Sequence, residues 1–199
     1  MTKALPVISF LASHGGSSAK FLIGAMQSGE LQATPGILIG NNRDSAILHW
    51  CLEHDMPFRH ISAKTHRGDD NADEAICSVL REAGTDVVVC SGYMKAIGPR
   101  TLAAFTGRIL NIHPALLPKH GGKGMYGDHV HAAVLAAGER ESGASVHVVS
   151  AGIDEGPVLL QSKVPVLPGD TLATLRARVQ ATEPALYLAA IKKFLAHNP

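Results

Sequence analysis

The sequence predicts an α/β fold in which helices cover both faces of a mostly parallel sheet, with an antiparallel addition toward the C-terminus. Apolar runs of strand length alternate with longer segments of helical spacing, the order expected of right-handed β-α-β units. The run DVVVC at residues 86–90 is almost continuously apolar, as in a strand covered on both faces. Later strands lie closer together, with Gly152 and Gly156-Pro157 between them, which favours an antiparallel pair.

Bulk properties indicate one folded domain, spanning residues 1–199. Hydrophobic residues make up 46% of the 199 residues and charged residues 18%, an ordinary globular composition. The net charge of +1 argues against nucleic acid as a partner, because a phosphate backbone requires a concentrated basic patch. The three cysteines form no close pair, and the first apolar run is too short to span a membrane. We therefore expect a cytoplasmic protein, a monomer or a homodimer, that acts on small molecules without membrane or nucleic-acid partners.

Periodicity assigns the elements of the first half in order. Apolar runs predict strands at residues 6–12, 36–40, 58–61 and 86–90. Between them, apolar residues at helical spacing predict helices at 19–28, 44–54 and 71–83. In the first of these helices the spaced residues are Phe21, Leu22, Ala25 and Met26. We expect this half to bind phosphate or nucleotide.

The second half is assigned in the same way. Apolar or alternating runs predict strands at residues 109–113, 145–149 and 158–166. We expect helices at 128–137 and 171–196, the latter as one long helix that closes the chain.

Two polar side chains end the strand at 109–113. Asn111 and His113 are two residues apart, so they project from the same face of the strand. Pro114 and Pro118 then fix the following turn. Ligands of open α/β sheets collect beyond the carboxyl ends of the strands, so this pair is placed to face a cleft. An isolated N-x-H would more often only cap a loop.

Asp154 follows the next strand in the Gly-rich segment 150–157. A carboxylate there can hydrogen-bond an imidazole, raise its pKa and hold its orientation. Taken alone, an Asp before Glu-Gly-Pro is more often a turn residue.

The first turn, SHGGSS at residues 13–18, separates a strand from a helix. Backbone N–H groups at a helix N-terminus bind phosphate, and glycine lets an anion approach closely. The turn matches neither G-x-G-x-x-G nor a Walker A loop, so a serine N-cap is an equally good interpretation.

The eleven histidines raise the alternative of a metal site. The candidate ligands are Asp128, His129, His131, His113 and His147. On a helix His129 and His131 lie about 200° apart and cannot share an ion. This stretch has no H-x-x-x-H or H-E-x-x-H spacing, so we expect no catalytic metal.

Together these segments resemble the glycinamide ribonucleotide (GAR) formyltransferases, within the 10-formyltetrahydrofolate-dependent formyltransferase family. The strongest stretch is RILNIHPALLPKHGG, followed by SGASVHVVSAGIDEGPVLLQSKVPVLPGDT and ARVQATEPALY. SGYMKAIGP at 91–99 resembles the family's Gly-aromatic-Met segment, and SHGGSS occupies its phosphate-loop position. The resemblance covers about residues 6–195.

The resemblance implies a single Rossmann-like domain that transfers a formyl group from 10-formyltetrahydrofolate to the amine of GAR, without a metal. It makes Asn111, His113 and Asp154 the catalytic set. It places Gly16, Ser17 and Ser18 at the GAR phosphate and Glu183 at the glycinamide end. Folate would be bound in the C-terminal half by Asn111, Asp154 and the backbone of 150–154, and also by Met94, Lys95, Ala96 and Ile97.

The chemistry of this set agrees with acyl transfer. Attack of an amine on a formyl group produces an oxyanion, for which an amide N–H and a protonated imidazole are suitable donors. We expect Asp154 to raise the pKa of His113 and keep it cationic, so that activity declines as the pH rises through that value.

The chain departs from the family at three places. Ser-His-Gly-Gly-Ser-Ser stands where many relatives have Ser-Gly-Asn-Gly-Ser-Asn, and Lys95 stands where arginine is common. The loop GGKGMYGDHVHAA is longer than in some members. In addition, an arginine that some relatives carry near residues 60–70 has no clear counterpart here, and Arg67 is only a candidate substitute for it.

The sequence is also compatible with other functions. The same residues could hydrolyse formyltetrahydrofolate, although relatives of that kind carry an additional N-terminal domain. A sugar amine could replace GAR as the acceptor. A non-catalytic folate- or nucleotide-binding module would not need Asn111, His113 and Asp154 together. Formyl transfer to initiator tRNA is disfavoured by the near-zero net charge.

Overall fold

The computed structural model describes residues 4–197, which fall into two compact units that meet between Leu110 and Asn111. The strands follow the order β3-β2-β1-β4-β5-β6-β7, and the unit boundary falls inside β5 (Ile109–His113). All strand pairs recorded among β1 to β4 are parallel, and β6 pairs with β7 antiparallel. The predicted α/β fold, with its antiparallel C-terminal addition, is confirmed.

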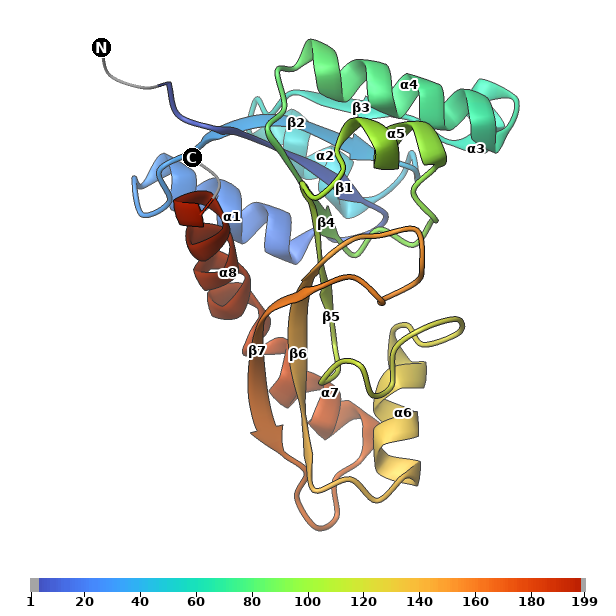
Figure 1. The fold of residues 1–199 in the computed structure, drawn as a ribbon, viewed down its shortest axis with the longest axis vertical. Helices are drawn as coiled ribbons and strands as arrows, with labels where there is room; N and C mark the ends of the chain where they lie inside the picture. The colour runs from blue at the N-terminus through green and yellow to red at the C-terminus, as the bar shows by residue number, and fades with distance from the viewer. Residues whose placement is uncertain (1–3, 198–199) are drawn as a thin grey trace. The chain divides into compact units, whose positions relative to one another are not determined.

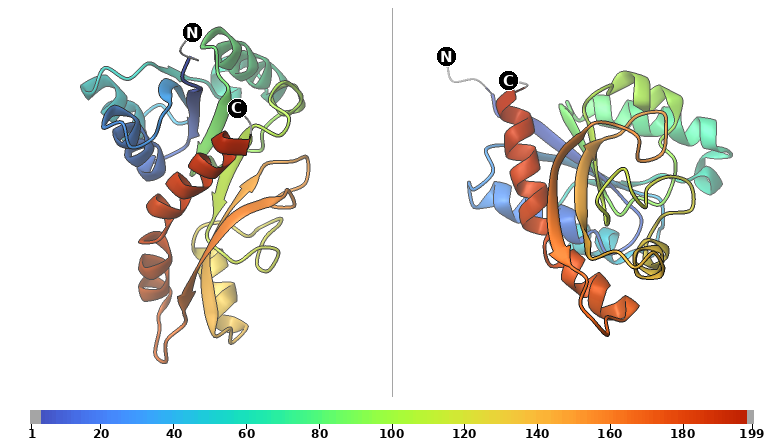
Figure 2. Two further views of the ribbon diagram at one scale, coloured as in Figure 1. Left: turned by 60° about the vertical axis from the view of Figure 1, so that its left-hand side comes forward. Right: turned by 60° about the horizontal axis from the view of Figure 1, so that its bottom comes forward.

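The first unit alternates strands and helices as the periodicity predicts. Its strands are β1 (Val7–Ala12), β2 (Thr34–Gly40), β3 (Phe58–His60) and β4 (Val87–Ser91). Its helices are α1 (Ser17–Gln27), α2 (Ala46–Glu53), α3 (Ala63–His66), α4 (Asp69–Glu82) and α5 (Pro99–Ala104). Within this unit α1 and α2 cover one face of the strands and α4 and α5 the other (Figures 1 and 2). The apolar strand residues Ile8, Phe10 and Leu11 are fully buried between these layers.

The second unit contains an antiparallel ribbon with helices beside it. Its further elements are α6 (Asp128–Ala136), β6 (Glu141–Val148), β7 (Val158–Pro165), α7 (Leu172–Gln180) and α8 (Glu183–His197). Both α7 and α8 contact the ribbon, and α6 contacts α7. Within residues 4–197, no helix combines the length and the apolar character needed to cross a membrane.

The prediction of a single helix at residues 171–196 is wrong, because the segment forms two helices, α7 and α8. Pro184 is the second residue of α8 and has no N–H to donate to a preceding turn. In a continuous helix its ring would also clash with the carbonyl group of Gln180, whereas proline fits the first turn of a new helix, so α8 starts here.

Strand β6 begins at Glu141, four residues before the predicted start. The earlier residues include Gly143, a type that weakens strand patterns. A Cβ at Gly143 would collide with the carbonyl oxygen of Ser162 on β7. Glycine is therefore required for the close approach of the two strands. The short helices α3 and α5 were also not predicted.

Candidate active site

Strand β5 brings Asn111 and His113 to its carboxyl end, as the strand pattern predicts. His113 is 4% exposed, and its Nε2 donates a hydrogen bond to the backbone carbonyl oxygen of His120 at 2.8 Å. This contact places the ring proton on Nε2, which leaves Nδ1 as the nitrogen available for proton transfer.

Asp154 lies beside His113, although it comes from the loop that follows β6. Its Oδ2 is 3.4 Å from Nδ1 of His113, and the N–H of Gly122 donates to the same oxygen at 3.1 Å. Asp154 has a φ of 59°, a left-handed conformation that Asp tolerates better than most residues. The structure therefore gathers Asn111, His113 and Asp154 in one cluster within the second unit.

His147 on β6 completes the cluster, and sequence reasoning considered it only as a metal ligand. It is 2% exposed and its Nδ1 donates to the carbonyl oxygen of Val148 at 3.2 Å. Its Nε2 lies 3.2 Å from Nδ2 of Asn111 and 3.5 Å from Oδ1 of Asp154. The signal in the sequence was a histidine inside an otherwise apolar strand, the position where a polar group needs a partner.

The predicted rise in the pKa of His113 is wrong. Burial lowers the pKa of this imidazole below its usual value, and Asp154 and the His120 carbonyl oxygen offset the effect only in part. Burial acts to raise the pKa of Asp154, but contacts with His147, His113 and the Gly122 N–H keep it below its usual value. At neutral pH the pair is therefore a neutral imidazole beside a carboxylate.

Side chains from the ribbon fix the turn after His113. The hydroxyl of Ser145 on β6 donates to the carbonyl oxygen of Ala115 at 2.6 Å and accepts from the N–H of Leu117 at 3.0 Å. Gln161 on β7 donates from Nε2 to the carbonyl oxygen of Leu117 at 2.9 Å. These bonds satisfy backbone groups that the proline-rich turn cannot pair internally, and they give β5 a fixed end.

Glu183 is the first residue of α8 and is half-buried. Burial raises the pKa of its carboxyl group from 4.5 to about 7. A carboxylate with so high a pKa is typical of a functional site, because it can exchange a proton near neutral pH.

The predicted phosphate loop lies in the first unit, at the N-terminus of α1. Gly16 has a φ of 59°, and a Cβ there would lie 2.6 Å from Cδ1 of Ile47. Packing against Ile47 and the left-handed backbone therefore both require glycine at this position. Ser17 is exposed at the start of α1, whereas Ser18 is 5% exposed and faces inward.

The predicted folate segment also lies in the first unit. The N–H of Met94 donates to Oγ of Ser13 at 2.8 Å, which ties this segment to the first turn. Lys95, Ala96 and Ile97 line a cavity of about 1170 Å³. Lys64 lines the same cavity, whereas Arg67, the basic residue singled out from the sequence, does not.

The candidate metal ligands of α6 have other surroundings. Asp128 forms an ion pair with Arg176 on α7, with Nη1 of the arginine 2.7 Å from Oδ1 of the aspartate. Among residues 4–197, no group of three His, Cys, Asp or Glu side chains has the spacing of a metal site.

Comparison with known proteins places this geometry in a family. Residues 7–191 match the formyl transferase family. A chloroplastic phosphoribosylglycinamide formyltransferase of Arabidopsis thaliana is 37% identical over 91% of this chain, which spans 62% of that relative's length. The phosphoribosylglycinamide formyltransferase of Mycobacterium tuberculosis is 37% identical over 94% of this chain and 84% of its own.

A solved structure agrees with these relatives. The glycinamide ribonucleotide transformylase 1 of Symbiobacterium toebii superposes with a TM-score of 0.88 at 32% identity, over 96% of this chain and 87% of its own. The match in sequence and fold covers the segments that carry Asn111, His113, His147 and Asp154. This chain belongs to the formyl transferase family.

Proposed function

We propose that this protein transfers the formyl group of 10-formyltetrahydrofolate to the amine of glycinamide ribonucleotide, a step of purine biosynthesis. The observation that carries the proposal is the buried cluster of Asn111, His113, His147 and Asp154. The family to which the chain belongs and the names of its relatives support the same reaction.

Asn111 and His113 suit the demands of the tetrahedral intermediate. An amide has two N–H donors, so Asn111 can donate one to His147 and the other to the oxyanion. His113 begins neutral and turns Nδ1 toward Asp154. Once protonated, the imidazolium stabilises the oxyanion, and Asp154 stabilises the imidazolium.

The proton then has a defined route. The substrate amine forms a bond to the formyl carbon and gives up a proton to Nδ1 of His113, directly or through a water held by Asp154. The bond between the formyl carbon and N10 breaks, and N10 of the departing tetrahydrofolate receives that proton. One carbon–nitrogen bond replaces another without oxidation or reduction, and the chemistry needs no metal.

The remaining site residues are proposed as binding groups. Gly16, Ser17 and Ser18 hold the ribonucleotide phosphate through the N-terminus of α1. Glu183 receives the glycinamide end as a hydrogen-bond acceptor.

Folate binding is proposed to involve Asn111, Asp154 and the backbone of residues 150–154. Met94, Lys95, Ala96 and Ile97 contribute as well, and the ammonium groups of Lys64 and Lys95 suit the carboxylates of a folate. Both substrates are small and water-soluble, so we propose a cytoplasmic enzyme without nucleic-acid or membrane partners.

The test is an assay of 10-formyltetrahydrofolate consumption with and without GAR. The proposal requires donor loss that depends on GAR and yields the formylated amide. Equal loss without GAR would identify a hydrolase, and loss that requires an amino sugar would identify a sugar-amine formyltransferase. Binding of both ligands without turnover would identify a binding module.

A further inference from the structure

The backbone carbonyl oxygen of His120 accepts a hydrogen bond from the His113 ring, although the backbone conformation of His120 is unfavourable. Its φ is 54°, a left-handed value that is strained for a non-glycine residue and persists only when its surroundings stabilise it. In this conformation its carbonyl oxygen accepts the Nε2–H of His113 at 2.8 Å. Something outside the backbone must hold His120 in place.

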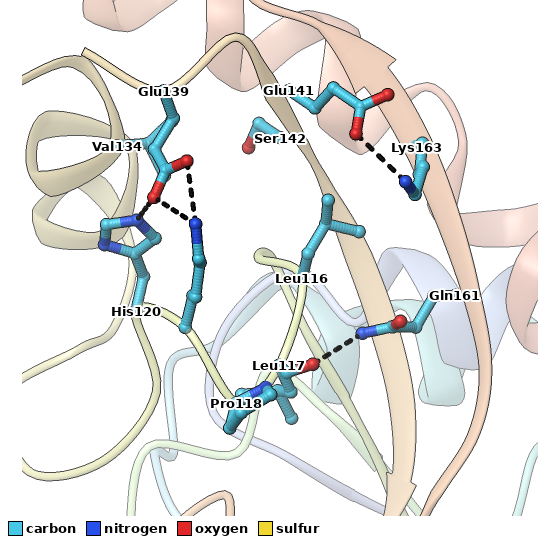
Figure 3. Close-up of a pocket in the computed structure, with 11 residues that line it drawn as sticks. Leu116, Leu117, Pro118, His120, Val134, Glu139, Glu141, Ser142, Gln161 and Lys163 are labelled. Atoms are coloured by element: carbon cyan, nitrogen blue, oxygen red, sulfur yellow. Dashed lines mark hydrogen bonds and ion pairs between the residues drawn. The ribbon is translucent and has the colours of Figure 1, made fainter. Parts of the chain in front are cut away.

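Glu139, in the turn between α6 and β6, provides that contact. Its Oε1 lies 3.3 Å from Nε2 of His120, and Lys119 donates from Nζ to both carboxylate oxygens at 3.0 and 3.1 Å. Figure 3 shows the His120 imidazole turned toward the Glu139 carboxylate. The side chains of His120 and Glu139 are 15% and 25% exposed, so the contact is partly shielded from water.

We infer that Glu139 is a positioning residue for formyl transfer, which it serves by anchoring His120 so that the His120 carbonyl oxygen fixes the tautomer and orientation of His113. The inference rests on the proposed function. With the proton held on Nε2, the lone pair of Nδ1 is directed to the side where Asp154 lies. Without the anchor, the carbonyl oxygen moves and the ring can also carry its proton on Nδ1, which removes the acceptor for the amine proton.

The surroundings of His113 show how the role proposed for Glu139 differs from that of Asp154. Asp154, His147 and His120 face the ring, and His131 on α6 acts on it at longer range. Asp154 therefore provides charge, whereas His120 provides a neutral acceptor for a specific ring nitrogen. Loss of Glu139 leaves Asp154 in place and should alter mainly the tautomer.

The test compares Glu139→Ala, which removes the hydrogen-bond acceptor of His120, with a matched control, Glu141→Ala. Both glutamates and His120 line a cavity of about 340 Å³. Glu141 lies apart from His120 in this cavity and pairs with Lys163, whose Nζ is 2.9 Å from Oε2 of Glu141 (Figure 3). Protein labelled with ¹⁵N-histidine, with the His113 signals identified by their loss in His113→Ala, reports the ring tautomer directly. We expect wild type and Glu141→Ala to hold the proton on Nε2 of His113, and Glu139→Ala to show a mixture of tautomers.

Kinetics provide the second measurement. Glu139→Ala should lower kcat roughly 10-fold with both KM values near those of wild type, because a misplaced catalytic group slows chemistry more than binding. Glu141→Ala should leave kcat unchanged. His120→Gly, which relieves the left-handed strain but removes the anchored imidazole, should lower kcat to a similar extent.

Three results would overturn the inference. These are an unchanged His113 tautomer in Glu139→Ala, equal kcat values in Glu139→Ala and Glu141→Ala, or full activity in His120→Gly. Failure of the proposed function is distinguishable, because wild type itself would then show no GAR-dependent loss of 10-formyltetrahydrofolate. An essential His113 with a silent Glu139 would contradict this inference alone.

Discussion

Nδ1 of His113 and Oδ2 of Asp154 lie 3.4 Å apart, yet the imidazole remains easier to deprotonate than a free histidine. Burial disfavours the charged ring more than the neighbouring carboxylate favours it. In the proposed mechanism the His113 ring therefore accepts a proton only during the reaction, and Asp154 then stabilises the resulting cation.

The first prediction concerns pH. The substrate amine must be neutral to attack, and α-amino groups have pKa values of about 7.7–8.0, so kcat/KM should fall about tenfold per unit below that pH. Below the lowered pKa of His113 the fall should steepen, because the ring is then already protonated. Asp154 raises the pKa of His113, so Asp154→Asn should move this second break to lower pH. A pH–rate series on both proteins with GAR varied tests this, and a break above pH 6.5 would contradict it.

The second prediction concerns the catalytic groups themselves. His113→Ala and Asp154→Asn should each lower kcat by at least ~10², the typical effect of removing a donor that stabilises an oxyanion. Thermal unfolding monitored by circular dichroism should show that both variants fold. Near-normal turnover at saturating substrates in either variant would refute the assigned mechanism.

The third prediction concerns Glu183. Its carboxyl group ionises near pH 4.5 when exposed and near 7 in the folded protein, so the folded state loses stability as the pH rises through this window. Glu183→Gln should therefore raise the Tm at pH 8 and change it little at pH 4. The same variant should raise the KM for GAR if Glu183 binds the glycinamide end. Glu155→Gln, at an exposed position, serves as the control and should show neither effect.

The fourth prediction concerns the phosphate loop. A Cβ at Gly15 meets no atom within 4 Å, so Gly15→Val should fold normally while its side chain obstructs the anion. The KM for GAR should rise roughly tenfold, equivalent to the loss of one charge-assisted hydrogen bond, with the folate KM unchanged. Gly24→Val, a similarly unobstructed position further along α1, should leave the GAR KM unaltered. Equal effects on both KM values would place the phosphate elsewhere.

Local patterns predicted the strands and the shared face of Asn111 and His113 because both depend on spacing along the chain, whereas the proposed catalytic set rests on the resemblance to the family. Asn111 and His113 share a face through strand alternation alone, and Asp154 follows β6 in an obvious turn. The division of the last helix into α7 and α8 does not follow from hydrophobic periodicity, which continues across Thr182. Pro184 is the residue in the sequence that marks the break.

Properties that depend on contacts across the fold were beyond the sequence. The partnership of His147 with Asn111 and Asp154 requires β5 and β6 to be placed in three dimensions. The direction of the His113 pKa depends on how completely the ring is buried, which spacing does not reveal. The position of Lys64 at the cavity of the first unit was not predicted either, because the short helix α3 that carries it has no periodic signal in the sequence.

The four clustered polar side chains all come from one uninterrupted stretch, residues 111–154. Their mutual distances are set by β5, β6 and the loops of that stretch, together with the bond from Gln161 on β7 that fixes the turn after His113. Residues that recognise the substrates and residues that carry out the reaction can then lie in different parts of the chain. Selection can retune which amine is admitted through residues outside this stretch while the acyl-transfer apparatus is inherited unaltered.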